Sequence, residues 1–442
     1  MSTDVAVIGA GPAGLGASLL LARAGAEVTL YERDARAGGR MRTETIDGAR
    51  VDVGVQLVSS TYRSVFAVSR DAGVSDRLLR SPGRDALWRK GRAHAITYGS
   101  VTSMAASSAL PALLKLRMAG RYLPFLTAHA RGLDANDPAG SGGAAHDRES
   151  IGAWGGRELG SDFVELLAYP LLAAYYGATP EQTSAAVYHA LARAGMDVSV
   201  YAAAGGFGAL AEGWLAAFEN AGGRYVPTAD VTGVEAQSDG VLVTTATGPV
   251  RHGAAIVAVP ARRAAQLFAG SELGAWLSRV RVQPTLTVAY RTDRPFPGDW
   301  FGLSFPRGDA IGDRVVALCI QSRKLRGLVP PGGDALVALP APTATPALLE
   351  QDDDSVARAV LAALERAVSG ITKHVSSAHV FRFDDGYTIF EPGYLQHLAR
   401  FDEHWLPRNV WLAGDYLVAP SVEGAVVSGL RAVQRVKTSV KA

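Results

Sequence analysis

Three glycines near the N-terminus have the spacing of a turn that holds a phosphate. Gly9, Gly11 and Gly14 stand in the stretch VIGAGPAGLG, between an apolar run at residues 4–8 and an amphipathic pattern that ends near residue 25. In a strand–turn–helix unit the first glycine permits the sharp turn, the second lets the backbone approach a pyrophosphate, and the third lets helix and strand pack closely. The free N–H groups of the helix start, where Pro12 and Ala13 lie, then face the phosphates.

An acidic residue ends the next predicted strand. That strand runs through AEVTLYE to Glu32, where a carboxylate can accept hydrogen bonds from both hydroxyls of a ribose and disfavours a 2′-phosphate. A glycine-rich turn with only a structural role would leave this acid unexplained. The unit therefore predicts dinucleotide binding, and these residues alone leave NAD and FAD open.

The stretch that follows Glu32 resembles the FAD-containing superfamily of amine oxidases, protoporphyrinogen oxidases and phytoene desaturases. The family pattern of an acid, a Gly-Gly-Arg triplet and an acidic–apolar–Gly motif corresponds here to Glu32, residues 38–40 and VDVG at 51–54. The resemblance implies that residues 38–40 pass the pyrophosphate, where Arg40 can pair with phosphate oxygens. It also implies that residues 54–56 run beside the isoalloxazine.

The C-terminal stretch VWLAGDYLVAPSVEGAVVSGL is similar to the closing FAD motif of the same superfamily. The resemblance implies that Asp415 reaches the ribityl or pyrophosphate region and that a helix beginning near Ser421 points at the flavin, where its dipole stabilises negative charge. Interior stretches at 205–231 and 254–268 match as well. The expected cofactor-binding residues are Gly9, Gly11, Pro12, Ala13, Gly14, Glu32, Arg33, Gly38, Gly39, Arg40, Gly54, Val55, Gln56, Val231, Gly414, Asp415, Glu423, Gly424 and Ala425.

The implied fold class is α/β, of the glutathione-reductase and amine-oxidase type. It has a discontinuous Rossmann-like FAD-binding domain, at residues 1–75, 205–290 and 385–442, and an α+β substrate-binding domain, at 76–204 and 291–384. The length of 442 residues agrees with two domains, because single cores stop growing at about 250–300 residues.

Residues 149–186 resemble most closely the protoporphyrinogen oxidase and desaturase branch. We expect a substrate cavity that orients its ligand by apolar contact with few polar anchors, lined by Gln56, Leu57, Tyr175, Tyr176 and Tyr387. Many amine oxidases carry a lysine in the segment that corresponds to RVQPTLTVAY, and the monoamine type has a tyrosine where this chain has Ser421. Both departures weaken a monoamine oxidase interpretation.

Composition excludes several other classes. The net charge is +2 with acidic and basic residues interleaved, so no nucleic-acid partner is expected. No histidine or cysteine spacing predicts a metal site. The one cysteine, Cys319, lies in an apolar run and is expected in the core, which predicts non-covalent FAD and fits a reducing compartment.

No leader and no membrane span are expected, so a cytoplasmic location is predicted. The segment 107–133 could lie on a membrane surface, but we expect it to pack internally or to line a substrate tunnel.

These observations predict an FAD-dependent oxidase, dehydrogenase or desaturase of bacterial secondary metabolism. Hydride would pass to the flavin N5 from a C–H beside nitrogen or a conjugated ring of a small, largely apolar or aromatic metabolite, and O₂ or another acceptor would reoxidise the flavin. No protein residue is singled out as catalytic, and the oligomeric state stays open. The alternatives are an amine or amino-acid oxidase, a flavin-dependent isomerase without net redox, and a lipid-binding carrier of the same fold.

Overall fold

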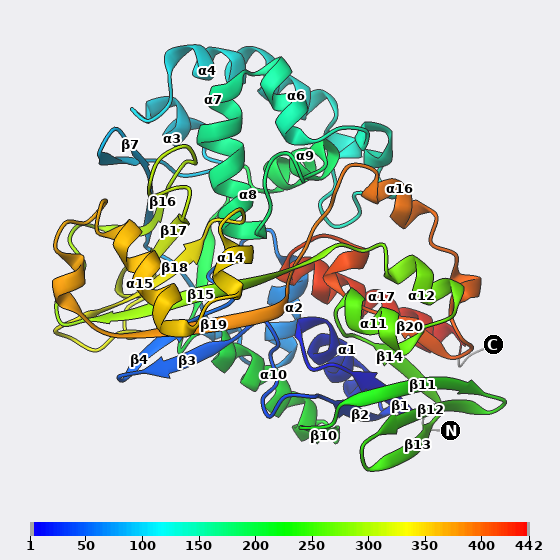
Figure 1. Ribbon diagram of the computed structural model, residues 1–442. Helices are drawn as coiled ribbons and strands as arrows, with labels where there is room; N and C mark the ends of the chain where they lie inside the picture. The colour runs from blue at the N-terminus through cyan, green and yellow to red at the C-terminus, as the bar shows by residue number, and fades with distance from the viewer. Residues whose placement is uncertain (1–3, 440–442) are drawn as a thin grey trace.

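A computed structural model describes residues 4–439. The unit that contains the N-terminal strand is built on a parallel sheet (Figure 1). The strands lie in the order β10-β2-β1-β14-β20 and all pair in parallel. The central strand β1 is buried because its run DVAVI is apolar almost throughout, as expected for a strand covered on both faces. The bounds are β1 Asp4–Ile8, β2 Glu27–Tyr31, β10 Arg224–Val226, β14 Ala254–Val257 and β20 Val410–Leu412.

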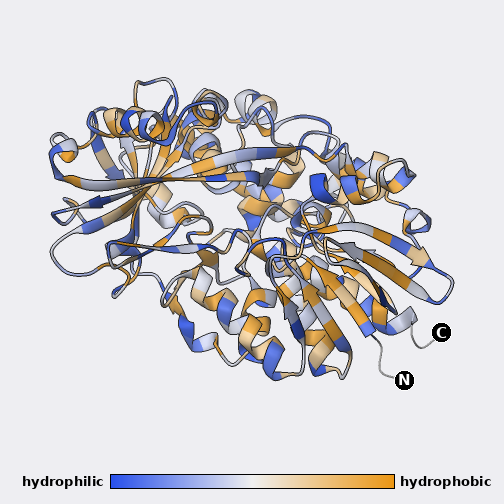
Figure 2. Ribbon diagram, turned by 60° about the horizontal axis from the view of Figure 1, so that its bottom comes forward, coloured by the Kyte–Doolittle hydropathy of each residue, from blue (hydrophilic) through white to orange (hydrophobic). Residues whose placement is uncertain are grey.

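Three helices cover one face of this sheet and share one hydrophobic core. They are α1 Pro12–Arg23, α10 Phe207–Asn220 and α17 Val422–Ser439, and α2 Arg63–Asp71 lies against α17. Close packing of α1 and α17 depends on Gly429, because a Cβ there would lie 2.4 Å from the carbonyl oxygen of Ala13. In Figure 2 hydrophobic residues colour the strands of the sheet, whereas hydrophilic residues gather in loops and on outer helix turns.

A small antiparallel sheet and two short helices cover the opposite face. They are β11 Val231–Gln237, β12 Gly240–Thr245, β13 Gly248–His252, α11 Ala261–Leu267 and α12 Glu272–Leu277. A separate hydrophobic core lies between them and the parallel sheet, and it includes residues of α16 Tyr394–Ala399.

The second unit is built on a mixed sheet of order β19-β15-β18-β17-β16-β7-β8. Helices α14 and α15 pack on one face, and α8 with the β3–β4 hairpin packs on the other. The bounds are β7 Arg84–Arg89, β8 Arg92–Ala95, β15 Val282–Thr292, β16 Trp300–Ser304, α13 Gln321–Lys324, β17 Val315–Ile320, β18 Asp334–Pro340, α14 Thr345–Leu349, α15 Asp353–Leu364, β19 Val375–Thr388, β3 Thr43–Ile46 and β4 Ala49–Asp52.

Helices between residues 101 and 194 form a cap over this second unit (Figure 1). They are α3 Val101–Ala106, α4 Ala112–Arg117, α5 Leu123–Ala128, α6 Ile151–Glu158, α7 Ser161–Phe163, α8 Tyr169–Tyr176 and α9 Ala185–Ala194. A separate three-stranded sheet has the order β5-β9-β6, with bounds β5 Val58–Ser59, β9 Val200–Ala203 and β6 Leu78–Arg80. Within 107–133, Leu114 and Tyr122 are buried in the cap, whereas Leu113 and Leu116 are exposed.

Two long strands join the units. The domain boundaries predicted at 290 and 385 fall inside β15 and β19, which pair along most of their length.

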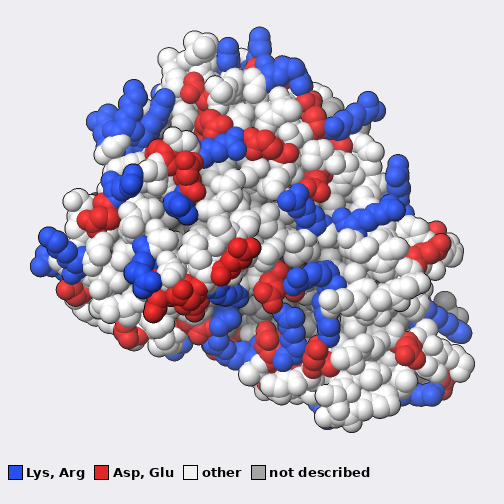
Figure 3. Space-filling view, in the orientation of Figure 1, with Lys and Arg blue, Asp and Glu red and all other residues white. Residues whose placement is uncertain are grey.

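Figure 3 shows basic and acidic side chains interspersed on the face in view. Among residues 4–439 no helix combines the length and apolar character needed to cross a bilayer.

Candidate functional site

Two adjoining cavities lie between the units. The sheet-end cavity is bordered by the residues that follow β1, β2, β14 and β20, which is the carboxyl edge of the parallel sheet, where ligands bind in open α/β folds. The aromatic cavity lies between α8 and the mixed sheet. Residues that line both cavities are Pro12, Arg40, Met41, Phe383, Asp415 and Ala425.

The glycine turn after β1 forms a wall of the sheet-end cavity. Gly9 has φ 101°, a left-handed conformation that side chains disfavour. A Cβ on Gly14 would lie 1.9 Å from the carbonyl oxygen of Gly9, so this glycine lets α1 begin directly against the turn. Nothing lies within 4 Å of the place where a Cβ on Gly11 would stand. The open space in front of Gly11 and the start of α1 fits a pyrophosphate.

Glu32 lines the same cavity and also braces the turn. Its Oε2 accepts a hydrogen bond from the Ala10 N–H at 2.6 Å, and its Oε1 accepts one from the Asp34 N–H at 3.0 Å. Burial raises the pKa of the Glu32 carboxyl, and the two N–H donors oppose that rise. The carboxylate therefore has fixed orientation at the end of β2, where a ribose would lie.

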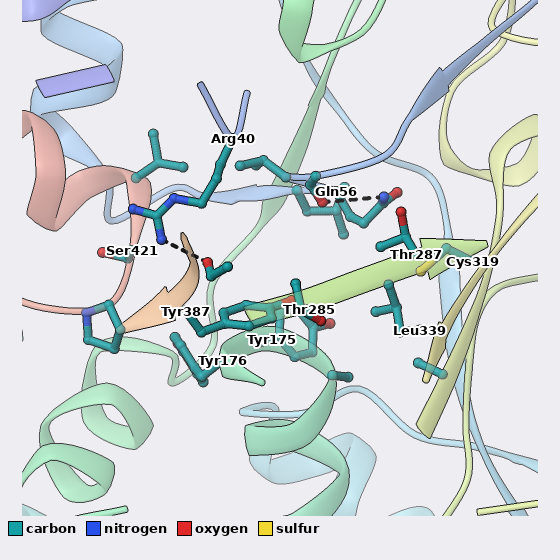
Figure 4. A pocket seen from close by; sticks show the side chains of 18 of the residues that line it. Arg40, Gln56, Tyr175, Tyr176, Thr285, Thr287, Cys319, Leu339, Tyr387 and Ser421 are labelled. Carbon is teal, nitrogen blue, oxygen red and sulfur yellow. Dashed lines mark hydrogen bonds between the residues drawn. The ribbon is translucent and has the colours of Figure 1, made fainter. Parts of the chain in front are cut away.

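Arg40 and Asp415 meet where the two cavities join (Figure 4). The Arg40 Nη2 donates to Asp415 Oδ2 at 2.8 Å, and Nη1 donates to the Gly386 carbonyl at 3.0 Å. Asp415 is buried and follows Gly414 directly after β20. We expected Arg40 to pair with phosphate oxygens, and the structure pairs it with Asp415 beside the same space.

Gln56 lines the aromatic cavity (Figure 4), and a buried ion pair holds its side chain. The amide nitrogen of Gln56 donates to the Asp52 carbonyl, and Gln56 Oε1 accepts from Lys324 Nζ at 3.3 Å. Lys324 also pairs with the carboxylate of Asp52, and both side chains are fully buried. The other Asp52 oxygen accepts from Thr43 and from the Phe207 N–H at the start of α10.

Tyrosines and threonines form most of the polar edge of the aromatic cavity. The five residues expected to contact substrate, Gln56, Leu57, Tyr175, Tyr176 and Tyr387, all line it. Thr285 and Thr287 of β15 line it too, and Thr287 donates to the Val53 carbonyl at 3.0 Å. None of its lining residues within 4–439 is a lysine.

Some expected cofactor residues line neither cavity. Gly14 lies behind the turn, Gly38 packs on the Met41 carbonyl and Gly424 packs on the Ala419 carbonyl. The Glu423 carboxylate is buried and accepts hydrogen bonds from the Ser64 and Val65 N–H groups at the start of α2. These residues shape the surrounding backbone, and Glu423 joins α17 to α2. The remaining expected cofactor residues line one cavity or both.

The sequence analysis missed Asp85 and placed Cys319 only in the core. Both line the aromatic cavity, on β7 and β17. Burial raises the pKa of the Cys319 thiol to about 12, so it stays a neutral thiol there. The one available signal was the alternation along β7, which puts Asp85 on the same face as Leu87, but no local pattern shows that this face borders a cavity.

The geometry is that of a dinucleotide-binding fold with a second, aromatic cavity beside the carboxyl edge of the parallel sheet. A family model for flavin containing amine oxidoreductase matches residues 12–437. The chain therefore belongs to this family of FAD-dependent oxidoreductases, as the sequence resemblance predicted, and its cofactor is FAD.

Proteins with several different names are similar in sequence to parts of this chain. A Mycobacterium tuberculosis protein provisionally named flavin-containing monoamine oxidase AofH is 29% identical over 59% of this chain and 57% of its own length. The hydroxyneurosporene desaturase of Rubrivivax gelatinosus is 41% identical over 18% of this chain and 15% of its own length. The chain thus matches little more than half of the first of these relatives.

The fold recurs in solved structures. A protein of Exiguobacterium sp. 255-15, provisionally named protoporphyrinogen oxidase, superposes with a TM-score of 0.78 over 99% of both chains at 19% identity. This likeness confirms the predicted α/β FAD-binding fold.

Proposed function

We propose that the protein is an FAD-dependent oxidase or dehydrogenase of the desaturase type. It would remove a hydride from a C–H next to nitrogen or a conjugated ring in a small, largely apolar or aromatic metabolite. The observation that carries the proposal is the aromatic cavity, which adjoins the sheet-end cavity and is lined mainly by aromatic and apolar side chains. Such a lining orients a substrate by shape and excludes water.

The residues present give FAD a defined place. The turn at Gly9–Pro12 and the start of α1 would hold the pyrophosphate, Glu32 the ribose, and Val231 the adenine side of the sheet-end cavity. Gly54, Val55 and Gln56 would lie beside the ring system in the aromatic cavity. When bound, the flavin supplies the hydride-accepting N5.

The chain's own residues would then contribute by positioning the substrate against the cofactor and by excluding water from the cavity. Tyr175, Tyr176 and Tyr387 would hold the substrate against the cofactor, and Gln56 would be fixed by Lys324 and Asp52. Positioning of this kind accounts for a large part of catalysis without a marked acid or base. An electron acceptor, O₂ or another, completes the cycle.

Flavin reduction under anaerobic conditions tests the proposal. Benzylamine should bleach the flavin band poorly, because none of the described residues that line the aromatic cavity is a lysine and Ser421 stands in place of an aromatic partner. A cyclic or conjugated substrate should bleach it, and Tyr175→Ala should slow bleaching at least tenfold with FAD content unchanged, while Tyr175→Phe keeps most of the rate because the ring contact remains.

The second candidate is an amine or amino-acid oxidase, which the name of the Mycobacterium tuberculosis relative favours. Rapid reduction by benzylamine, at about 1–10³ s⁻¹, would replace the desaturase-type proposal with this one. An equal loss in the alanine and phenylalanine variants at Tyr175 would contradict orientation by ring contact.

A further inference from the structure

Asp85 lies at the end of the aromatic cavity away from Arg40. In the mixed sheet Asp85 of β7 is paired with Gly302 of β16, and Gly302 is paired with Cys319 of β17. Residues paired across a sheet share a face, so the three form one row of the cavity wall. Figure 4 shows Cys319 across the aromatic cavity from Arg40, which also lines the sheet-end cavity.

A glycine beside Asp85 leaves room for its carboxyl group. A Cβ on Gly302 would lie 2.4 Å from Asp85 Oδ1, so any side chain at 302 would displace the carboxylate. Gly302 does not have a left-handed φ, so its backbone does not require glycine. The role of Gly302 is spatial, and the space it leaves is occupied by the carboxylate of Asp85.

No group in the described part of the chain forms a hydrogen bond with this carboxylate. Among residues 4–439 no hydrogen bond or ion pair reaches either of its oxygens. The neighbouring Tyr98 hydroxyl is bonded to Ser304 Oγ at 2.8 Å, and Ser304 Oγ in turn donates to the Ala86 carbonyl at 3.2 Å. The Tyr98 proton is therefore directed to Ser304 and away from Asp85.

An unpaired carboxyl in an apolar cavity carries a desolvation cost that a ligand can offset. A cation offsets it most, because it supplies both a charge and N–H donors to a site of low dielectric. A neutral hydroxyl supplies only one donor. The carboxyl of Asp85 thus distinguishes ligands by charge at the end of a cavity that otherwise selects by shape.

We propose that Asp85 binds a basic nitrogen of the substrate, at the end of the aromatic cavity away from the flavin. The substrate class is then an elongated, largely apolar or aromatic ammonium compound whose charged nitrogen is remote from the C–H that is oxidised. This inference rests on the proposed function, because it takes the aromatic cavity to hold the substrate.

The site should depend on pH in a defined direction. Burial raises the pKa of Asp85 to about 7, whereas the groups that face it, Tyr98, Tyr175 and Cys319, have pKa values raised by burial and stay neutral in this range. An alkylammonium with a pKa near 10 stays charged as well. Cation affinity should therefore be highest above pH 7 and fall about tenfold per pH unit below it, as Asp85 takes up a proton.

Matched probes test this in the oxidised holoenzyme. Phenylalkylamines with two to six methylenes, and the alcohols of the same lengths, are titrated while the visible flavin spectrum reports binding and anaerobic bleaching reports turnover. At pH 8 at least one amine should bind about tenfold or more tightly than its alcohol. The alcohol affinities should not change between pH 6 and pH 8.

Two variants test whether the preference for amines over alcohols depends on Asp85. Asp85→Asn keeps the shape and should abolish both the preference for amines and its pH dependence, with alcohol affinity within about threefold of wild type. Asp239→Asn removes an exposed carboxylate in the β11–β12 hairpin and should change neither. Should Asp85→Asn fail to fold, the pH profile of wild-type amine binding decides alone.

The outcomes separate this inference from the proposed function. Amines that bind no more tightly than alcohols at pH 8, or a preference that survives in Asp85→Asn, would overturn the assignment. Amine preference that depends on Asp85, without bleaching by any cyclic or conjugated compound, would support the assignment and contradict the proposed reaction.

Discussion

At the scale of single residues, Glu32 has two tasks that act through the same carboxylate. It fixes the glycine turn through the Ala10 N–H, and it borders the place where the ribose would lie. Charge-assisted hydrogen bonds of this kind contribute about 1.5–3 kcal/mol each. Removing only the charge of Glu32 and removing its whole carboxyl group should therefore weaken FAD binding to different degrees.

Glu32→Ala should lower FAD affinity tenfold or more, because the ribose contacts and the support of the turn are lost together. Glu32→Gln should lower it less, since one amide oxygen still accepts from an N–H. Reconstitution of apoprotein with FAD, followed by flavin fluorescence, measures both constants, and circular dichroism checks the fold. Equal affinities in wild type and the alanine variant would show that neither the ribose contacts of Glu32 nor its support of the turn contributes to FAD binding.

At the scale of elements, Asp52 joins the β3–β4 hairpin to α10 and α13, which lie far from it in the chain. It ends β4, accepts from Thr43 of β3 and from the start of α10, and pairs with Lys324 at the end of α13. The Lys324 ammonium also lies 5.6 Å from the centre of the Phe207 ring. A buried pair of this kind is costly to break, because the remaining charge has no water around it.

Lys324→Met should therefore lower the free energy of unfolding by about 3–5 kcal/mol. Adding Asp52→Asn should recover part of the loss, because no buried charge remains and the amide oxygen can still accept from Phe207. Thermal unfolding of both holoproteins measures the order of stabilities. A double variant no more stable than Lys324→Met would mean that the pair is not the source of the loss.

These elements also show what sequence spacing can and cannot predict. Gly9, Gly11 and Glu32 were recognisable because strand, turn and helix are contiguous, so local order fixes their geometry. Asp85 and Lys324 reach the site through the register of β7, β16 and β17 and through the position of α13, which depend on pairings between distant segments. Glu423 lay in a recognised motif, but its contact with α2 was visible only in three dimensions.

At the scale of the whole molecule, FAD would lie across the junction of the two units and contribute to the stability of both. No cysteine lies in the glycine turn or in the C-terminal motif, and the Cys319 thiol is held neutral by burial, which favours non-covalent binding. A ligand that binds only the folded chain stabilises it by about 2.7 kcal/mol at a hundredfold excess over its dissociation constant.

Denaturation should release one FAD per chain into solution, and the melting temperature of the apoprotein should rise with added FAD. Adding NAD at equal concentration is the control and should leave the melting temperature unchanged. Flavin that stays with the precipitated chain would show a covalent link, and NAD recovered in place of flavin would contradict the cofactor assignment.

The residues that line both cavities bear on the order in which the cofactor and a substrate would bind. Pro12, Arg40 and Asp415 border both spaces, so the two cavities share part of their walls. Bound FAD would lie along these shared walls, and its ring system would form one side of the space in which a substrate rests. The cofactor would then complete the substrate pocket, and we expect the flavin to bind first and the metabolite second.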